Sequence, residues 1–406
     1  MAEAVIVSTA RSPIGRAFKG SLREMRGDDL AAQMVQAALA AVPELDASTI
    51  DDLMMGCAQP AGEQGYNIAR MVAMQLGLDS VPGTTVHRYC SSSLQTTRMA
   101  FHAIKAGEGD AFISAGVETV SRFGAGKSDG MPDTKNPAFT AAMERTAALA
   151  ADPTLSWNDP RLKGELSDIY IAMGDTAENV AQLRNVSRAA QDEWAVHSHH
   201  KAEAAAARGF WAKDITPVTL ADGSVVSTDD GPRAGVQLEK LAGMQPVFRE
   251  HGTVTAANCC PLNDGAAALV IMSDTKANEL GLKPLARIVS TGVAAMTPEL
   301  MGLGPVEAVR RALSNARMSI KDMDIMELNE AFAAQVLPSI DEIGIDPEKV
   351  NVNGGAIALG HPFGMTGARM TTTAINALRE RDEQFAVETM CVAGGQGMAL
   401  VLERLN

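Results

Sequence analysis

Short apolar runs alternate with longer stretches of helical period along the first 120 residues. Four runs have the length and composition of strands buried on both faces: AVIVST, DLMMGC, TTVHRY and AFISAGV. Three stretches between them repeat apolar residues at helical spacing: Asp29–Leu39, Ile68–Leu76 and Leu94–Ile104. This alternation predicts an α/β unit built around a sheet of buried strands.

A similar order returns from about residue 285. Three runs are typical of strands: ARIVSTGV, MDIMEL and FAVETMCVAGG. Three stretches have helical period: Pro305–Asn315, Glu330–Ile340 and Thr366–Leu378. An apolar, glycine-rich stretch precedes the last helix, where a third strand is expected. We interpret the two regions as duplicated βαβ units.

The residues between the two units, roughly 121–257, break this rhythm. Pro, Asp and Gly cluster there around a single well-patterned helical stretch, Ser187–Arg208. We interpret this segment as an inserted lid or loop domain. The expected division is a first core half of residues 1–120 plus 258–276, an inserted domain of residues 121–257, and a second core half of residues 277–406.

The duplication places two reactive side chains in equivalent loops. Cys90 lies between the third strand and its helix in the first half, and His361 has the same position in the second. A pseudo-twofold pairing of the halves would bring these loops to one crevice beyond the carboxyl ends of the strands, where open sheets bind ligands. Asn329 and Cys391 follow later strands of the second half. We therefore expect four reactive or polar groups to converge.

The context of Cys90 indicates a nucleophile. In VHRYCSSSLQ a strand ends at Cys90 and Ser-Ser-Ser opens an amphipathic helix. The helix dipole and free amides at such a position favour the thiolate. A lone cysteine is more often inert and buried, so this alternative stays open from the residues alone.

The other three positions each have a structural alternative. In NGGAIALGHPFG, the glycines around His361 suit a tight loop that a substrate approaches closely. In CVAGGQG, Cys391 precedes a glycine turn whose amides could face an oxyanion, or which is simply a β-turn. In ELNEAFA, Asn329 stands between a strand and a helix, where an N-cap is the ordinary interpretation.

Composition narrows the function classes. The formal net charge of −14 argues against broad binding to nucleic acid or anionic membranes, so a polyanionic ligand needs a local basic patch. Five unevenly spaced cysteines indicate free thiols rather than a disulfide framework. The N-terminal AVIVSTA lacks the zones of a signal peptide, and no apolar run is long enough to span a bilayer. We expect a cytoplasmic protein.

No metal site is expected. His197, His199 and His200 lie on one helical stretch without cysteine or carboxylate partners at ligand spacing. The adjacent Cys259 and Cys260 chelate poorly as neighbours, so packing beside a ligand is the simpler interpretation.

Taken together, these stretches resemble the thiolase family over essentially the whole chain. The motifs that carry the resemblance are ARSPIG, MGDTAENVA, LNDGAAALV, NEAFA, GGAIALGHP and CVAGGQG. The resemblance implies duplicated βαβαβαββ halves that form a five-layered αβαβα core with an inserted loop domain. It also implies a homodimer or homotetramer, and an acyl-CoA acyltransferase activity of the degradative, β-oxidation type.

The resemblance assigns roles by position. Cys90 is implied as the acylated nucleophile, His361 as its base and Cys391 as the acid/base at the second substrate's α-carbon. Asn329 would hold a water that, with His361, stabilises an enolate-like oxygen. The backbone amides of Cys90 and Ala393 would form a second oxyanion hole. Coenzyme A would be a co-substrate, with no permanently bound cofactor.

Four further residues are implied to contact the substrate or coenzyme A. They are Arg233, Met173, Cys260 and Phe332. Arg233 could equally be a solvated surface arginine, although its fork pairs well with phosphate oxygens.

The sequence departs from the common family pattern in places. Ser91 and Ser93 stand where glycine is frequent, and Ala393 replaces a usual glycine. Bulkier residues there could narrow the crevice, and a positive φ at Ala393 would cost about 1 kcal/mol. Ala172 stands where acetoacetyl-specific members carry histidine, which favours longer or bulkier acyl chains.

Three alternatives remain. A ketoacyl synthase shares the duplicated fold, but Cys391 and NEAFA argue against it. A non-catalytic binding protein of the sterol-carrier type would lack the Asn-Glu-Ala-Phe stretch, which is intact here. An acetoacetyl-CoA-specific biosynthetic thiolase is the remaining possibility.

Overall fold

The computed structural model describes residues 2–125 and 134–406. The first half contains β1 (Ala4–Arg11), β2 (Gly15–Arg16), α1 (Gly27–Ala40), β3 (Asp52–Gly56), α2 (Ile68–Gln75), β4 (Gly83–Val86), α3 (Ser92–Ala106), β5 (Ala111–Thr119), β8 (Asn263–Ser273) and α9 (Asp274–Glu279). The second half contains β9 (Ala286–Ala295), α10 (Gly304–Ala316), β10 (Ile325–Leu328), α11 (Ala333–Ile343), α12 (Ala356–Leu359), α13 (Thr366–Arg381), β11 (Phe385–Val392) and β12 (Gln396–Arg404).

The strand order shows the duplication directly. From the centre outward, the first half runs β1, β8, β5, β3, β4 and the second runs β9, β12, β11, β10. In each half the outer strands are parallel and the inner ones antiparallel. The halves meet where β1 pairs with β9, at Val5↔Arg287 and Ile6↔Ala286. The predicted duplicated α/β fold is therefore confirmed.

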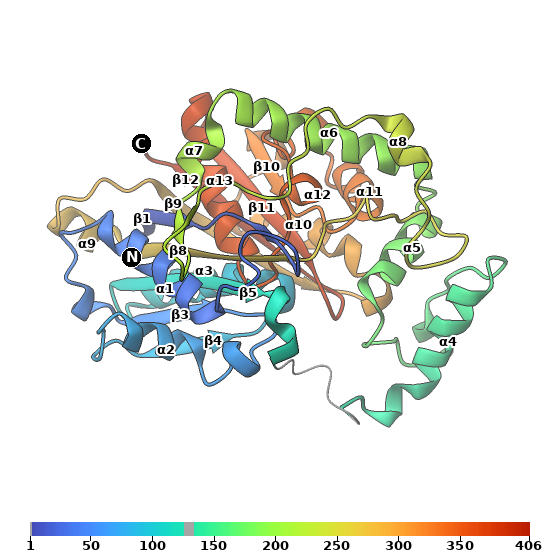
Figure 1. Cartoon of the computed structure of the whole chain (residues 1–406), viewed down its shortest axis with the longest axis horizontal. Coiled ribbons are helices and arrows are strands. Elements are labelled where there is room, and N and C mark those ends of the chain that lie inside the picture. The colour runs from blue at the N-terminus through green and yellow to red at the C-terminus, as the bar shows by residue number, and fades with distance from the viewer. Residues whose placement is uncertain (1, 126–133) are drawn as a thin grey trace.

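Alternating side chains on the strands separate the layers. On β1, Val5 and Val7 pack with α1 and α2, whereas Ile6 joins a second cluster that contains residues of α3 and α13. On β12, Val401 packs with α10 and α11, whereas Leu400 joins the α3 and α13 cluster. Helices α3 and α13 thus form a central layer between the two half-sheets, with helices outside both (Figure 1). This is the expected αβαβα order.

Two sequence expectations need correction. The third strand of the second half is reduced to one parallel bridge, Met326↔Val350, and the glycine-rich stretch instead forms the short α12. The middle segment holds more than one helix: α4 (Thr140–Ala151), α5 (Met173–Leu183), α6 (Arg188–Ala207), α7 (Phe210–Asp214) and α8 (Leu238–Ala242), with the small hairpin β6 (Val218–Thr219) and β7 (Val225–Val226). Figure 1 shows α6 lying along the second half, while α4 projects to one side.

Candidate active site

Cys90 lies in a 3-10 turn between β4 and α3. The residue is 8% exposed, and the preceding Tyr89 adopts a positive φ of 42° that turns the chain into the helix. The backbone N–H groups of Ala393 and of Cys90 itself lie near the sulfur and lower the pKa of the thiol. Burial outweighs them and raises that pKa to about 12. The amides at the helix start thus favour the thiolate as expected, but in the unliganded protein burial opposes them and has the larger effect.

The serines that follow Cys90 point into the protein. Ser91 and Ser93 are fully buried. The Ser91 hydroxyl donates to Arg88 O at 3.2 Å, and Ser93 Oγ accepts the N–H of Ala368 at 3.0 Å, at the start of α13. Neither serine lines the cavity beside Cys90. The expectation that these two residues narrow the crevice is wrong, because the Ser91 side chain bonds within its own turn and the Ser93 side chain bonds to α13.

The tautomer of His361 follows from one hydroxyl. The Thr366 hydroxyl donates its single proton to Pro362 O at 2.7 Å, and the same oxygen lies 2.6 Å from His361 Nδ1. With its proton on Pro362 O, the hydroxyl accepts from Nδ1–H, and this arrangement leaves Nε2 without a proton. Burial and the charge of Arg369 lower the pKa of the imidazole to about 3, so the ring is neutral at pH 7.

Asn329 presents its amide to this ring. Asn329 Nδ2 lies 3.3 Å from His361 Nε2, as a donor to an unprotonated nitrogen requires. The backbone of Asn329 is held on both sides, because its N–H donates to Thr389 O at 3.0 Å and its carbonyl accepts Gln335 Nε2 at 3.0 Å. The N-cap of α11 is Phe332, so the N-cap interpretation of Asn329 is wrong.

Cys391 lies near the end of β11, before a turn in which Gly394 and Gly395 take the positive φ angles. Ala393 does not have a positive φ, so the cost considered for alanine does not arise. Burial raises the pKa of the Cys391 thiol, and the nearby Cys90 raises it further. Cys260 is close enough to both thiols for their charge to raise its own pKa. The structure thus gathers Cys90, Cys260 and Cys391 in one region.

A cavity of about 410 Å³ opens beside Cys90. We call it the Cys90 cavity. Its lining includes Tyr89, Cys90, Phe363, Ala393, Gly394 and the segment Ile169–Met173. Ala172 and Met173, singled out in the sequence, lie in this lining. Phe332 lies outside it, in the buried cluster that contains Cys391 and is flanked by Met173.

Comparison with known proteins places this arrangement in a family. Residues 4–275 match the thiolase N-terminal domain and residues 282–404 match the thiolase C-terminal domain. The chain belongs to the thiolase family. Members of this family are acyltransferases that use coenzyme A thioesters.

Relatives align with this thiolase over the full length. A beta-ketoadipyl-CoA thiolase of Escherichia coli is 45% identical, with all of both chains covered. A 3-ketoacyl-CoA thiolase of Bacillus subtilis (strain 168) is 42% identical, covering 99% of this chain and all of the relative. The crystal structure of human mitochondrial 3-ketoacyl-CoA thiolase superposes with a TM-score of 0.86 at 31% identity, covering 100% of this chain and 99% of that chain.

A second cavity of this thiolase, of about 580 Å³, collects cationic side chains. We call it the Arg233 cavity. Its lining includes Arg16, Lys19, Arg233, Lys240, His199 and Cys260. Burial, together with Arg233 and Arg16, lowers the pKa of His199 to about 4. This is the local basic patch that a polyanionic ligand of an acidic protein requires.

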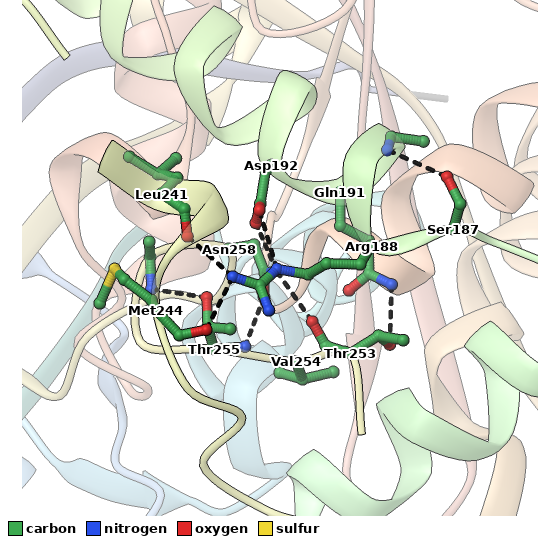
Figure 2. Close-up of polar contacts among 12 residues, drawn as sticks. Ser187, Arg188, Gln191, Asp192, Leu241, Met244, Thr253, Val254, Thr255 and Asn258 are labelled. Atoms are coloured by element: carbon green, nitrogen blue, oxygen red, sulfur yellow. Dashed lines mark hydrogen bonds and ion pairs between the residues drawn. The ribbon is translucent and has the colours of Figure 1, made fainter. Parts of the chain in front are cut away.

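The segment that leads to Cys260 is fixed by helix α6 (Figure 2). Asp192 accepts Asn258 Nδ2 at 2.9 Å and Arg188 Nε at 2.8 Å. The same Arg188 donates to Leu241 O at 2.8 Å, in α8. The thiolase therefore holds one wall of the Arg233 cavity through buried polar contacts with the middle segment.

Glu118 is a buried side chain that the sequence did not indicate. Its carboxylate accepts the N–H groups of Ala58 at 2.8 Å, Gln59 at 3.2 Å and Gly364 at 2.9 Å. Burial raises its pKa to about 7. Ala58 and Gln59 belong to the first half and line the Cys90 cavity, whereas Gly364 belongs to the second half and follows His361. Glu118 therefore connects the two halves beside the cavity through its hydrogen bonds.

Asn263 and Thr366 were also missed. Asn263 Oδ1 accepts the N–H of His361 at 2.9 Å from the start of β8. In the sequence, the only local indication that Thr366 contacts the His361 ring is that its hydroxyl follows the histidine by five residues. Within residues 2–125 and 134–406, the structure contains no cluster of three His, Cys, Asp or Glu that could hold a metal ion. In the same ranges, no helix is long and apolar enough to cross a membrane.

Proposed function

We propose that the chain cleaves 3-ketoacyl-CoA with coenzyme A, giving acetyl-CoA and a shortened acyl-CoA, and that it catalyses the reverse Claisen condensation. The observation that most supports this is the interaction of the Ala393 N–H with the Cys90 sulfur, which lowers the pKa of the thiol, in the cavity that both residues line. It joins the candidate nucleophile of one half to the glycine turn of the other, next to Cys391. That turn then supplies an amide where negative charge develops.

In the first half-reaction, Cys90 attacks C3 of the substrate as its proton passes to His361 Nε2. The neutral thiol and neutral imidazole make this transfer unfavourable before substrate binds. It proceeds with attack, because the charge moves at once to an oxygen held by the amides of Cys90 and Ala393. The C2–C3 bond then breaks, its electron pair forms the acetyl-CoA enolate, and Cys391 protonates C2.

In the second half-reaction, the Cys391 thiolate takes the proton of the coenzyme A thiol. The resulting thiolate attacks the acyl group on Cys90, and the released Cys90 sulfur regains its proton from His361. Asn329, with a water and His361, stabilises the enolate oxygen in the first half-reaction. The cycle needs no oxidant, since every bond and proton is restored.

We further propose that coenzyme A enters through the Arg233 cavity, with Arg233 as a phosphate contact and Cys260 beside the pantetheine arm. Residues 121–257 would form the inserted domain that carries this cavity and contacts between copies in a cytoplasmic homodimer or homotetramer. Ala172 in the Cys90 cavity favours acyl groups longer than acetoacetyl. Relatives named 3-ketoacyl-CoA thiolase and beta-ketoadipyl-CoA thiolase support this direction.

Two serine variants test the roles of the thiols. Cys90→Ser should abolish the acyl-enzyme, because an alcohol is a far weaker nucleophile than a thiolate. Cys391→Ser should still acylate at Cys90 but lose condensation and enolate protonation. Intact-mass spectrometry after incubation with acyl-CoA measures the adduct. Normal turnover by Cys90→Ser would overturn the assignment.

A substrate panel separates the alternatives. Thiolysis of 3-ketoacyl-CoA esters is followed by loss of magnesium-enolate absorbance, from acetoacetyl to longer chains. Rates that rise beyond four carbons support the degradative activity, and a sharp preference for acetoacetyl-CoA indicates the biosynthetic type. Binding of acyl-CoA without turnover of any ester would indicate a non-catalytic binding protein.

A further inference from the structure

The Cys90 cavity has an apolar wall and one charged side chain. Ile169, Ile171 and Met173 supply apolar surface, and Ile169 lies close to Gly394 at the turn that follows Cys391. Lys135 is the one ionic side chain among the described residues that line this cavity. The side chain of Lys135 is exposed to solvent, so its ammonium stands at the solvent side of this apolar wall, within reach of a charged group at the far end of a bound acyl chain.

The charge of Lys135 has no carboxylate partner within residues 2–125 and 134–406. Its ammonium instead lies 5.7 Å from the ring centroid of Tyr170, which also lines the cavity. A cation held against an aromatic face remains able to form an ion pair with an incoming anion.

Tyr170 adds a neighbouring donor. Its hydroxyl oxygen accepts the N–H of Asn136 at 2.9 Å, and its ring packs edge-to-face on Phe139 at 5.6 Å. These contacts hold the tyrosine against the segment that carries Lys135. The hydroxyl proton is then directed away from Asn136, since that bond uses the oxygen as the acceptor.

The phosphates of coenzyme A do not account for Lys135. The Arg233 cavity is a separate hollow with four cations of its own: Arg16, Lys19, Arg233 and Lys240. The two cavities share no lining residue. A cation in the Cys90 cavity therefore faces the acyl group rather than the nucleotide.

We propose that the acyl group of the substrate ends in a second carboxylate, which Lys135 pairs and Tyr170 assists by hydrogen bonding. The substrate class is then the coenzyme A thioesters of 3-oxo dicarboxylic acids, whose methylenes pack on the Ile169, Ile171 and Met173 wall. This inference rests on the proposed thiolase activity and specifies its substrate.

A matched pair of six-carbon substrates tests it: 3-oxoadipyl-CoA, which ends in a carboxylate, and 3-oxohexanoyl-CoA, which ends in a methyl group. The wild-type protein should cleave 3-oxoadipyl-CoA with a kcat/KM about two- to fivefold higher, as an ion pair with an exposed lysine predicts. Lys135→Met should remove this preference and leave cleavage of 3-oxohexanoyl-CoA within about twofold. Added salt should lower the wild-type preference.

Two further variants serve as controls. Lys135→Arg keeps the charge and should retain most of the preference. Lys163→Met removes an exposed lysine that lies outside the Cys90 cavity, and should change neither rate. Equal cleavage of both substrates by the wild type, or equal loss on both in Lys135→Met, would overturn the inference and leave the thiolase activity standing. Cleavage of neither substrate would instead count against the thiolase activity.

Discussion

At the scale of single residues, the hydroxyl of Thr366 decides which nitrogen of His361 can act as a base. Thr366→Val should leave the buried Nδ1–H without an acceptor, which costs about 1–3 kcal/mol and allows the other tautomer. We expect kcat for thiolysis to fall about 10- to 100-fold. KM should change little, because the fully buried Thr366 lines neither cavity.

Thr372→Val is the matched control for this prediction. Thr372 lies in the same helix and is equally buried, but its hydroxyl bonds only to Ala368 O of its own helix, at 3.0 Å. Its kcat should stay within about twofold of the wild-type value. An equal loss of kcat in both variants would show that the hydroxyls act through helix stability and not through the imidazole.

The sequence indicated some of these residues and not others, for a physical reason. Cys90 and His361 are recognisable because strand, loop and helix follow one another locally around them. The Ala393 amide and the Cys90 sulfur belong to residues about 300 positions apart, so no local sequence pattern indicates that they lie together. Lys135 stands in a polar segment without periodicity, so only the folded chain shows that it faces the cavity.

At the scale of elements, the start of α13 lies directly against the start of α3. A Cβ at Gly367 would lie 2.7 Å from Leu94 Cβ and 2.8 Å from Leu94 Cα, in the central layer of the fold. Gly367→Ala gains up to about 1 kcal/mol of helix propensity. Forced separation of packed helices costs about 1–3 kcal/mol, which exceeds the gain in helix propensity. Gly367→Ala should therefore lower the free energy of unfolding.

Urea unfolding measures this change, with Gly243→Ala as its control. Gly243 has a negative φ and open space around its would-be Cβ, so alanine there should be neutral or slightly stabilising. Because Ser93 and Ala368 bridge the same crossing, Gly367→Ala should also reduce thiolysis. A stability at or above the wild-type value would mean that α3 and α13 can separate freely.

Element prediction succeeded where buried positions are apolar and failed where they are few or polar. The core strands appeared as apolar runs because both faces are covered by helices. Helix α4 was missed because Ala142 is its one buried residue, which leaves no apolar face to detect. Helix α5 was missed because it buries Thr176, Glu178 and Asn179, whose polarity hides the period.

At the scale of the whole molecule, three buried carboxyl groups link folding to pH. Burial raises the pKa of Glu118 to about 7 and those of Glu327 and Glu388 to about 8. Between pH 4.5 and these values, the folded protein holds protons that the unfolded chain has released. Stability must therefore fall as pH rises through this window. Buried histidines act in the opposite sense, but only below about pH 6.5.

The test is the midpoint of thermal unfolding, Tm, measured between pH 7.5 and 8.5, where the histidine contributions are nearly complete. Wild-type Tm should fall across this range. Glu327→Gln and Glu388→Gln should flatten the curve, because glutamine has no proton to lose. Glu348→Gln, whose side chain is 75% exposed, should follow the wild type. A wild-type Tm that rises from pH 7.5 to 8.5 would mean that Arg369 holds these carboxylates ionised, and that the central layer contains a full ion pair.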